Sequence, residues 1–513
     1  MAHYFLNAWQ TVRSHMPGAC GERTELDHFA KHGQGKSDTE MASYRHYEGT
    51  EEGGAPRIAG TEDYDAPDLL IAITDRGRVM AVNNLCVCFV CEKCNLGLIL
   101  LCCGRIGVPN VLIGGMFIVS LPYAVLYGGY WAVFSLAFVA YICCHTGKIL
   151  VACLYELNDR GEMERVRDSY VDIAQSCLGE RYGGKMVNMA QIIELLMTCI
   201  LYVVLCGDLM IGSFPEGPID QRSWMMISTM FLLPCAFLKK LTAVSWLSFW
   251  CTMAHVLINV IILGFCLIKA PEWQWSKVTF SIDGSMFPVT LGIVVFSYTS
   301  QIFLPSLEGN MKDKSKFHCM LDWSHIAAAV FKAGFAWLAF LTFGEETQEV
   351  ITNNLPTKGF KVIVNLILVI KALLSYPLPY FAAANLLESA LFQGQPKTKF
   401  PSCVAQDGEL RIWAVALRVL LVIFTMLLAI TIPHFAILMG LIGSFTGTML
   451  SFVWPCYFHM KLKRNDMTRF GVAWEMSIIF MGVMCGVIGI YSSAKALVAA
   501  YHIPLPYPQI RPT

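Results

Sequence analysis

The sequence predicts an all-α membrane protein with about eleven transmembrane helices, two of them broken near the middle of the bilayer. Of its 513 residues, 55% are hydrophobic and only 15% are charged, and the mean hydropathy is +0.52. Apolar runs long enough to cross the hydrocarbon core, about 20 residues each, recur along the chain. Two of these runs are interrupted by glycine, proline or hydroxylated residues, which weaken a helix at that point.

The apolar runs divide the chain into three parts. Residues 1–107 form a polar, cytosolic N-terminal tail that ends in an atypical cysteine-rich segment. Residues 108–493 form the transmembrane domain, and residues 494–513 form a short lumenal C-terminal tail. The predicted spans are 108–126, 130–154, 187–211, 224–238, 244–268, 288–307, 324–344, 362–387, 412–432, 435–458 and 472–493.

Lysine and arginine predict the orientation, because they concentrate in cytosolic loops. One set of alternate loops is rich in these residues, from Arg160 to Arg469. The opposite set holds only Arg222, Lys269, Lys277, Lys358 and Lys361. The N-terminus is therefore expected in the cytosol and, with an odd number of spans, the C-terminus in the lumen.

Composition excludes several classes of function. A formal net charge of zero indicates no nucleic-acid partner. No nucleotide loop or nucleophile motif is present, so neither an enzyme nor a cofactor is expected. Most of the 20 cysteines lie in apolar spans, where a thiol behaves as a small hydrophobe. The pair Cys91 and Cys94 has zinc-ligand spacing but no matching second pair, so no metal site is predicted, and acylation beside the membrane is a comparable interpretation.

The most informative segment lies in the sixth span, where Ser297, Tyr298, Thr299 and Ser300 follow one another. Backbone without helical hydrogen bonds is tolerated at this depth only inside protein or beside a cavity. A polar, broken helix at the midplane is the usual build of a solute-binding site in a secondary transporter. Tyr298, Thr299 and Ser300 are therefore predicted to bind substrate.

The first span carries a second weak point at Gly114, Gly115, Met116 and Phe117, followed by Pro122. Freed N–H groups and the positive end of a half-helix suit the carboxylate of an amino acid. Close helix packing through small residues is the alternative interpretation. These four residues complete the predicted substrate site.

Ionisable residues inside spans are expensive and normally face the interior of the bundle. Gln191, Glu194, Thr198 and Tyr202 share one face of the third span, and Glu194 is the candidate for proton coupling; a structural hydrogen bond is its alternative role. Lys371, in the eighth span, either replaces a bound sodium ion or pairs with a carboxylate such as Glu194.

Two further residues carry weaker predictions, and one motif lies outside the spans. Lys332 is expected to extend toward the membrane surface and His255 to satisfy a backbone carbonyl. In the tail, Asp65, Leu69 and Leu70 fit an acidic dileucine motif that sorting adaptors bind, although a chance match is about as frequent.

The sequence resembles the amino acid/auxin permease family, and most specifically its vesicular branch, which carries GABA and glycine. The resemblance covers about 115–495, and its longest matching run, FSYTSQIFLPSLEGNM, occupies 296–311. The chain departs from the family's Trp- and Asn-containing half-helix just before Gly115. The other matching stretches are 121–124, 128–130, 146–150, 154–156, 166–170, 191–195, 371–379 and 433–436.

The resemblance implies a leucine-transporter-type fold, with two inverted five-helix repeats and a final helix, whose first and sixth helices are broken. It implies a secondary active antiporter that loads GABA, glycine and, as a further candidate, β-alanine into synaptic vesicles, driven by protons. Participation of chloride is left open. A lysosomal or plasma-membrane amino acid permease, coupled to sodium, and an amino-acid-sensing membrane protein are the alternatives.

Overall fold

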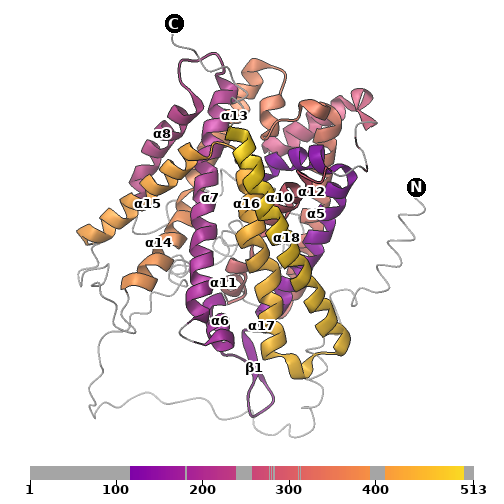
Figure 1. Ribbon diagram of the computed structural model, residues 1–513, viewed down its shortest axis with the longest axis vertical. Coiled ribbons are helices and arrows are strands. Elements are labelled where there is room, and N and C mark those ends of the chain that lie inside the picture. The colour runs from indigo at the N-terminus through magenta and orange to yellow at the C-terminus, as the bar shows by residue number, and fades with distance from the viewer. Residues whose placement is uncertain are drawn as a thin grey trace, which may run out of the picture. The chain divides into compact units, whose positions relative to one another are not determined.

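The structure is a computed structural model that describes residues 116–179, 182–237, 257–275, 278, 280, 283–309, 311, 314–392 and 411–501. The described residues are almost entirely helical, and a two-stranded hairpin is the one sheet among them (Figure 1). The predicted all-α membrane architecture is confirmed at this level.

The first half of the described chain begins at Met116 and ends before the sixth span. Its elements are η1 (Met116–Ser120), α5 (Leu121–Ala152), β1 (Tyr155–Leu157), β2 (Met163–Arg165), α6 (Tyr170–Leu178), α7 (Gly183–Ser213), α8 (Gln221–Leu232), η2 (Leu233–Phe237), the apolar helix Leu257–Ile268 and η3 (Ala270–Glu272).

The second half contains the broken helix and the last five long segments. Its elements are α10 (Phe287–Tyr298), η5 (Gln301–Phe303), α11 (Leu304–Gly309), η6 (Lys314–Lys316), α12 (Phe317–Phe343), η7 (Gly344–Glu346), η8 (Ile351–Asn354), α13 (Lys358–Ser375), α14 (Pro377–Phe392), α15 (Ile412–Thr431), α16 (Phe435–Ile442), the π-helical η9 (Gly443–Gly447) and η10 (Met449–Val453), α17 (Trp454–Leu462), η11 (Arg464–Asp466) and α18 (Arg469–Tyr501).

Eight described segments are long and apolar enough to cross a membrane, so the predicted count of about eleven is only partly confirmed. The predicted spans 224–238 and 244–268 are described in part, as α8 with η2 and as Leu257–Ile268. The predicted spans 108–126 and 130–154 form one segment, Phe117–Ala152. Gly129, with φ 50° and ψ −138°, is the single non-helical residue between the two arms. Its lack of a Cβ permits this conformation.

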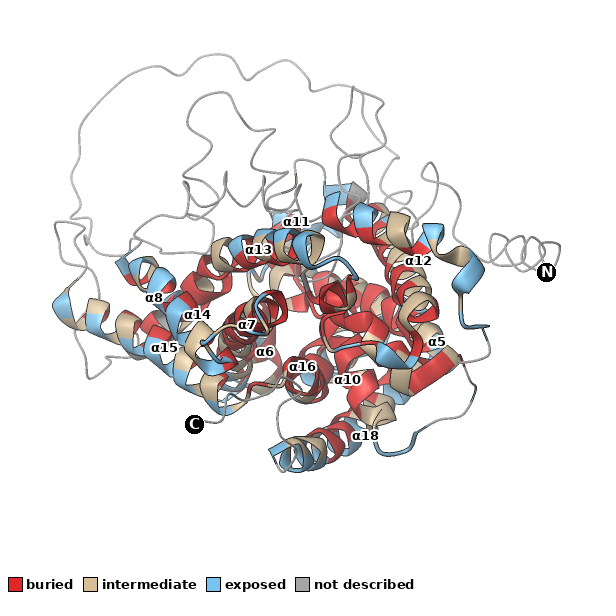
Figure 2. Ribbon diagram, turned by 90° about the horizontal axis from the view of Figure 1, so that it is seen from above, coloured by how far each residue is buried: buried red, intermediate tan, exposed pale blue. Residues whose placement is uncertain are grey.

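Burial separates central helices from peripheral ones. In the most apolar stretch of α7, 83% of the residues are buried, against 28% in α18. Figure 2 shows the same contrast, with α7, α10 and α16 largely buried and the outer faces of α15 and α18 exposed. The exposed faces of α15 and α18 are apolar, as expected of helices that border lipid.

Glycines bring α10 and α16 together around the broken segment. A Cβ at Gly292 would collide with the Gly440 carbonyl, and a Cβ at Gly443 would collide with the Gly292 carbonyl. Helices in a membrane pack closely through such small residues. The upper half of the broken helix is therefore held directly against the helix that contains the π-helical turns.

Candidate substrate and coupling site

The predicted break in the sixth span is confirmed. Helix α10 ends at Tyr298, and the next residue, Thr299, is extended, with φ −66° and ψ 107°. The chain passes Ser300 and resumes helical structure in η5 and α11. Thr299 and Ser300 are buried, so the open backbone lies inside protein, as membrane depth requires.

Gln301 holds the break in place, and sequence reasoning did not single it out. Its Oε1 accepts a hydrogen bond from the Ser300 N–H at 2.9 Å and one from the Ser451 hydroxyl at 2.7 Å. Its Nε2 donates to the Thr146 hydroxyl at 3.3 Å and approaches the Cys143 carbonyl at 3.5 Å. One buried amide thus joins the break to α5 and to η10. The signal for Gln301 in the sequence was an amide side chain directly after four polar residues in an otherwise apolar run.

The ammonium of Lys332, a residue of α12, lies beside the C-terminal end of α10. The expectation that this side chain extends toward the membrane surface is wrong. Its side chain is fully buried. The Nζ atom donates to the Ser297 carbonyl at 2.5 Å and lies 3.5 Å from the centre of the Tyr298 ring. The last carbonyls of a helix carry partial negative charge, and an aromatic face attracts a cation. The break provides both, so the ammonium is directed inward.

Hydroxyl groups at the break differ in what they already bind. Ser297 donates to the Val294 carbonyl at 2.8 Å, and Thr299 donates to the Val295 carbonyl at 3.0 Å. Within the described part of the chain, the buried Ser300 hydroxyl has no hydrogen-bond partner, and neither does that of Ser120 at the start of α5. Buried polar atoms are normally satisfied, so an unsatisfied one at a helix break suits an incoming polar ligand.

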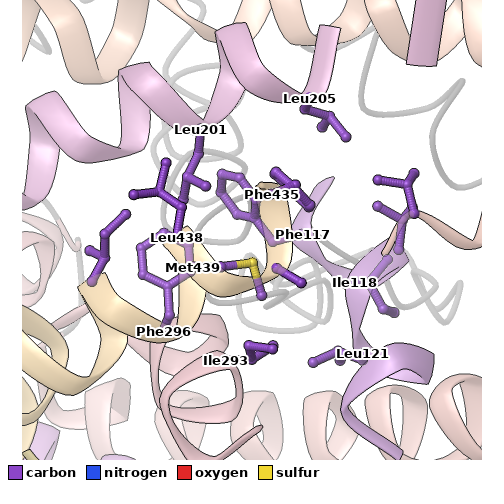
Figure 3. Packing of buried hydrophobic residues seen from close by; sticks show 14 of the residues in the cluster. Phe117, Ile118, Leu121, Leu201, Leu205, Ile293, Phe296, Phe435, Leu438 and Met439 are labelled. Atoms are coloured by element: carbon purple, nitrogen blue, oxygen red, sulfur yellow. The ribbon is translucent and has the colours of Figure 1, made fainter. Parts of the chain in front are cut away.

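Phe117 brings the first span to the sixth. Its ring centre lies 5.1 Å from that of Phe296, 5.4 Å from Tyr202 and 6.2 Å from Phe435. Figure 3 shows Phe117, Phe296 and Phe435 pointing toward one another from η1, α10 and α16. Together they form an apolar wall next to the break. Gly114 and Gly115, and the side chain of Met116, lie outside the described residues.

The predicted polar face of the third span turns inward. Gln191, Glu194, Thr198 and Tyr202 are all buried in α7. Glu194 Oε2 accepts a short hydrogen bond from the hydroxyl of Thr446, which lies in the π-helical η9. Single π-helical turns occur often at functional sites. The candidate coupling carboxylate is thus bonded to the irregular part of the helix that packs on α10.

Lys371 is buried in α13, which packs along α7, the helix that carries Glu194. His255 and the sorting residues Asp65, Leu69 and Leu70 lie outside the described residues. Among the described residues, no cluster of histidine, cysteine and acidic side chains could hold a metal ion.

A loop between α12 and α13 covers the site on the side predicted to be lumenal. Its short helix η8 contacts η1, α7 and α13. Asn353 of η8 donates to the Asp208 carboxylate at 3.1 Å and accepts from Asn365 at 2.9 Å. A Cβ at Gly212 would collide with the Asn353 amide, so this glycine permits the close approach.

The same loop is attached to the beginning of α16. Glu349 Oε2 accepts a hydrogen bond from the Ala436 N–H at 2.8 Å, and Glu349 Oε1 lies 3.8 Å from His434 Nδ1. A carboxylate at a helix N-terminus is favoured by the helix dipole. The loop 344–357 therefore bridges α7 and α16 over the site.

A family model described as "Transmembrane amino acid transporter protein" matches residues 110–495. The vesicular inhibitory amino acid transporter of Xenopus tropicalis is 55% identical over 392 residues, with 76% of each chain covered. The human protein of the same name is 54% identical, with 76% of this chain and 74% of that protein covered. The vesicular GABA transporter of Caenorhabditis elegans is 48% identical over 388 residues, with 76% and 78% covered.

Two solved structures are similar in fold at 10% sequence identity. MhsT in complex with L-phenylalanine has a TM-score of 0.47, with 82% of this chain and 99% of that chain covered. Mhp1, a nucleobase-cation-symport-1 family transporter with bromovinylhydantoin bound, has a TM-score of 0.45, with 82% and 91% covered.

Proposed function

The chain belongs to the transmembrane amino acid transporter protein family, and we propose that it loads GABA and glycine into synaptic vesicles in exchange for protons. The observation that supports this most strongly is the buried break at Tyr298–Ser300, placed between a buried ammonium and an apolar wall. The vesicular relatives named above share most of the chain at 48–55% identity.

In this proposal the zwitterionic substrate binds at the break. The hydroxyl of Ser300 and the open backbone at Thr299 hydrogen-bond its polar ends, and Phe117 packs against its methylene groups. Gly114, Gly115 and Met116 would complete the site from the first span. Lys332 sets the charge of the site, because its ammonium can be shared between the Ser297 carbonyl and a substrate carboxylate. β-Alanine, intermediate in length between glycine and GABA, fits the same chemistry.

Glu194 is the proposed proton carrier, with Lys371 as the positive charge on the neighbouring helix. When Glu194 is protonated, burial between α7 and η9 is compatible with its neutral form. When it is ionised, the Thr446 hydroxyl donates to it. A change in its protonation therefore acts on the π-helical turn that packs on α10.

The energetics suffice for vesicle loading. A pH difference of ~1.5 units supplies ~2 kcal/mol per proton, and a membrane potential of ~80 mV adds ~1.8 kcal/mol per charge. Exchange of one zwitterion for one proton uses both, about 4 kcal/mol in all, and sustains a concentration ratio of ~10³. Chloride, if it also moves with the substrate, would change this sum.

Uptake by purified protein in liposomes with an acidic interior tests the proposal. We expect accumulation of labelled GABA and glycine that disappears when a protonophore is added and is unchanged when sodium is replaced by choline. Uptake that requires sodium would instead identify a sodium-coupled amino acid permease of the lysosome or plasma membrane. Specific binding without any uptake would indicate an amino-acid-sensing protein.

Vesicular localisation, with a cytosolic N-terminus and a lumenal C-terminus, is part of the same proposal. Leu69→Ala and Leu70→Ala together should move the protein toward the cell surface, because adaptors read the dileucine motif that begins at Asp65. Quantitative surface labelling of the full chain measures this shift, and unchanged vesicular localisation would show that the match arose by chance.

A further inference from the structure

The hairpin that follows α5 is a rigid element that projects from the side of the molecule rich in basic loops. Strands β1 and β2 pair antiparallel, with Tyr155 opposite Arg165 at the base of the hairpin. The Asn158 side chain accepts hydrogen bonds from the N–H groups of Arg160 and Glu162, both at 3.0 Å. Gly161 occupies the left-handed region, with φ 78°. The turn is therefore fixed by its own residues.

The two residues at the base of the hairpin both reach Glu308, in the lower half of the broken helix. The Tyr155 hydroxyl donates a short hydrogen bond to Glu308 Oε1, and Arg165 Nη1 lies 3.1 Å from Glu308 Oε2. Burial and the neighbouring carboxylate raise the pKa of Tyr155, so the hydroxyl keeps its proton and remains a donor. Glu308 itself is buried, with 1% of its surface exposed.

Arg165 also binds the backbone of α11. Its Nη2 donates to the Pro305 carbonyl at 3.1 Å, and a Cβ at Gly309 would collide with its guanidinium. The guanidinium is oriented in turn by the Arg167 carbonyl and the Asp168 carboxylate, both at 3.2 Å. Arg165 therefore covers the end of α11 as well as its buried carboxylate.

Helix α11 depends on such contacts for its position. It has six residues, and an isolated helix of that length is unstable in water. Leu304 and Leu307 pack in a cluster with Leu150 of α5, Tyr170 of α6 and Phe317 of α12. At its N-terminal end, α11 follows η5 and the non-helical break at Thr299 and Ser300. A movement of α11 away from the hairpin would uncover the break on the side predicted to be cytosolic.

We propose that Tyr155, Arg165 and Glu308 form a cytosolic latch, which closes the cytosolic route to the substrate site and releases α11 once in each transport cycle. In Figure 1 the hairpin lies below α11 and next to α6, at the end of the helices that the sequence predicts to be cytosolic. A buried carboxylate that loses its partner carries a large penalty unless it reaches water. Breaking the ion pair should therefore favour the state in which α11 has moved and Glu308 is hydrated.

Arg167 provides a matched control two residues away. It bonds Glu156, the Cys153 carbonyl at 2.9 Å and Ser176 at 2.8 Å, all within the hairpin and its flanking helices. Among the described contacts, none of those made by Arg167 reaches α11. Arg165→Ala and Arg167→Ala thus remove the same charge at two positions of one short segment, at the end of β2 and just after it, but only the first is expected to release α11.

The first measurement is hydrogen exchange in the full-length protein in nanodiscs, followed by mass spectrometry. We expect Arg165→Ala to increase amide exchange in residues 301–309 by about tenfold or more, and Arg167→Ala to leave it unchanged. The double variant Arg165→Glu with Glu308→Arg should restore much of the protection. Tyr155→Phe, which keeps the ring and removes one hydrogen bond, should give a smaller increase in exchange. It takes the place of Arg165→Ala as the test variant if that protein does not fold.

The second measurement separates a latch from a merely structural contact. In proteoliposomes, a weakened latch raises the population open to the cytosol, so the KM for substrate added on that side falls while the maximal rate falls too. A structural defect would lower the maximal rate without lowering KM. Equal effects of Arg165→Ala and Arg167→Ala in both measurements would overturn the proposal, as would a charge swap that restores nothing.

Discussion

The two closures of the site, on the sides predicted to be lumenal and cytosolic, are built from different chemistry. On the lumenal side, loop 344–357 is held by an amide–carboxylate contact, Asn353 with Asp208, and by Glu349 with Ala436 and His434. On the cytosolic side, the hairpin is held by the guanidinium of Arg165 on the buried Glu308. The first closure thus uses carboxylates, an amide and an imidazole, whereas in the second a carboxylate is paired with a guanidinium, which stays charged in an acidic compartment.

This difference bears on how protons would drive the transport cycle. In the proposed cycle, the carboxylates and the imidazole that hold loop 344–357 face the acidic compartment, whereas Arg165 and Glu308 face the cytosol. The coupling candidate Glu194 lies between the two closures, bonded to Thr446 in the π-helical η9. An acidic lumen would thus act first on the lumenal closure and then on Glu194, while the cytosolic closure responds only to movement of α11.

The largest effect is expected from Glu194→Gln, which tests whether the two closures are linked by a proton carrier. The amide mimics the protonated carboxyl group, so substrate should still bind and exchange. Accumulation driven by a pH gradient should fall from ~10³ to near unity, because the proton no longer moves. Uptake and counterflow assays in proteoliposomes measure the two properties separately.

Glu475→Gln is the matched control for that experiment. Glu475 is also a buried carboxylate within a span, but it lies in α18 and bonds His459 of α17 at 2.7 Å. Gradient-driven uptake should survive this change. If Glu194→Gln accumulates GABA as steeply as the parent, Glu194 is a structural hydrogen-bonding residue and the two closures are linked by other groups.

The second largest effect, on the KM for substrate, is expected at the helix break that both closures cover. Ser300→Ala should raise the KM for GABA by about tenfold, because it removes a hydroxyl that is free to bond the charged end of the substrate. Thr299→Val should have a smaller effect, since that hydroxyl already bonds the Val295 carbonyl. Ser135→Ala removes a buried hydroxyl of α5 that bonds Ala132 and should change neither KM nor rate. Equal KM values for the Ser300 variant and the parent would remove Ser300 from the substrate site.

Local signals in the sequence predicted the features that depend on local residues. The run of hydroxylated residues at 297–300 indicated the break, and the spacing of Gln191, Glu194 and Thr198 indicated an inward-facing stripe. The predicted spans 108–126 and 130–154 lie on either side of Gly129, the single non-helical residue of the segment that they form. Each of these features follows from conformational preference or from helical periodicity.

The features that sequence reasoning missed depend on partners distant in the chain. The inward direction of Lys332 is determined by a carbonyl 35 residues earlier, which is free only because the helix breaks there. The bond between Thr446 and Glu194 joins residues 252 apart, and the π-helical turns of η9 lie inside one predicted span, 435–458. From the sequence alone, Arg165 is one of many cations in the basic loops, and only the fold shows that it lies beside Glu308.

The amide contacts of the lumenal loop allow a third test, with a neighbouring residue as control. Asn353→Ala removes the bonds to Asp208 and Asn365, so the loop should open more often toward the lumen. Efflux of preloaded substrate through the lumenal side should rise several-fold. Asn354→Ala loses bonds only within the loop, to Gln348 and Glu346, and should have little effect on efflux. Matching efflux rates for the two variants would mean that Asn353 does not hold the closure.

The smallest effect, and the most direct test of the contrast between the two closures, is on the local opening of each side. Glu349→Gln keeps the size of the side chain and removes the carboxylate that accepts the Ala436 N–H, so amide exchange in η8 should increase several-fold. Exchange in α11 should not change, since the pair of Arg165 and Glu308 is untouched. His434→Gln should have a smaller effect on η8, because Glu349 still accepts a hydrogen bond at the beginning of α16. Hydrogen exchange followed by mass spectrometry measures these rates in the full chain. If Glu349→Gln loosens η8 and α11 in parallel, the two closures do not open separately and the proposed order of events is wrong.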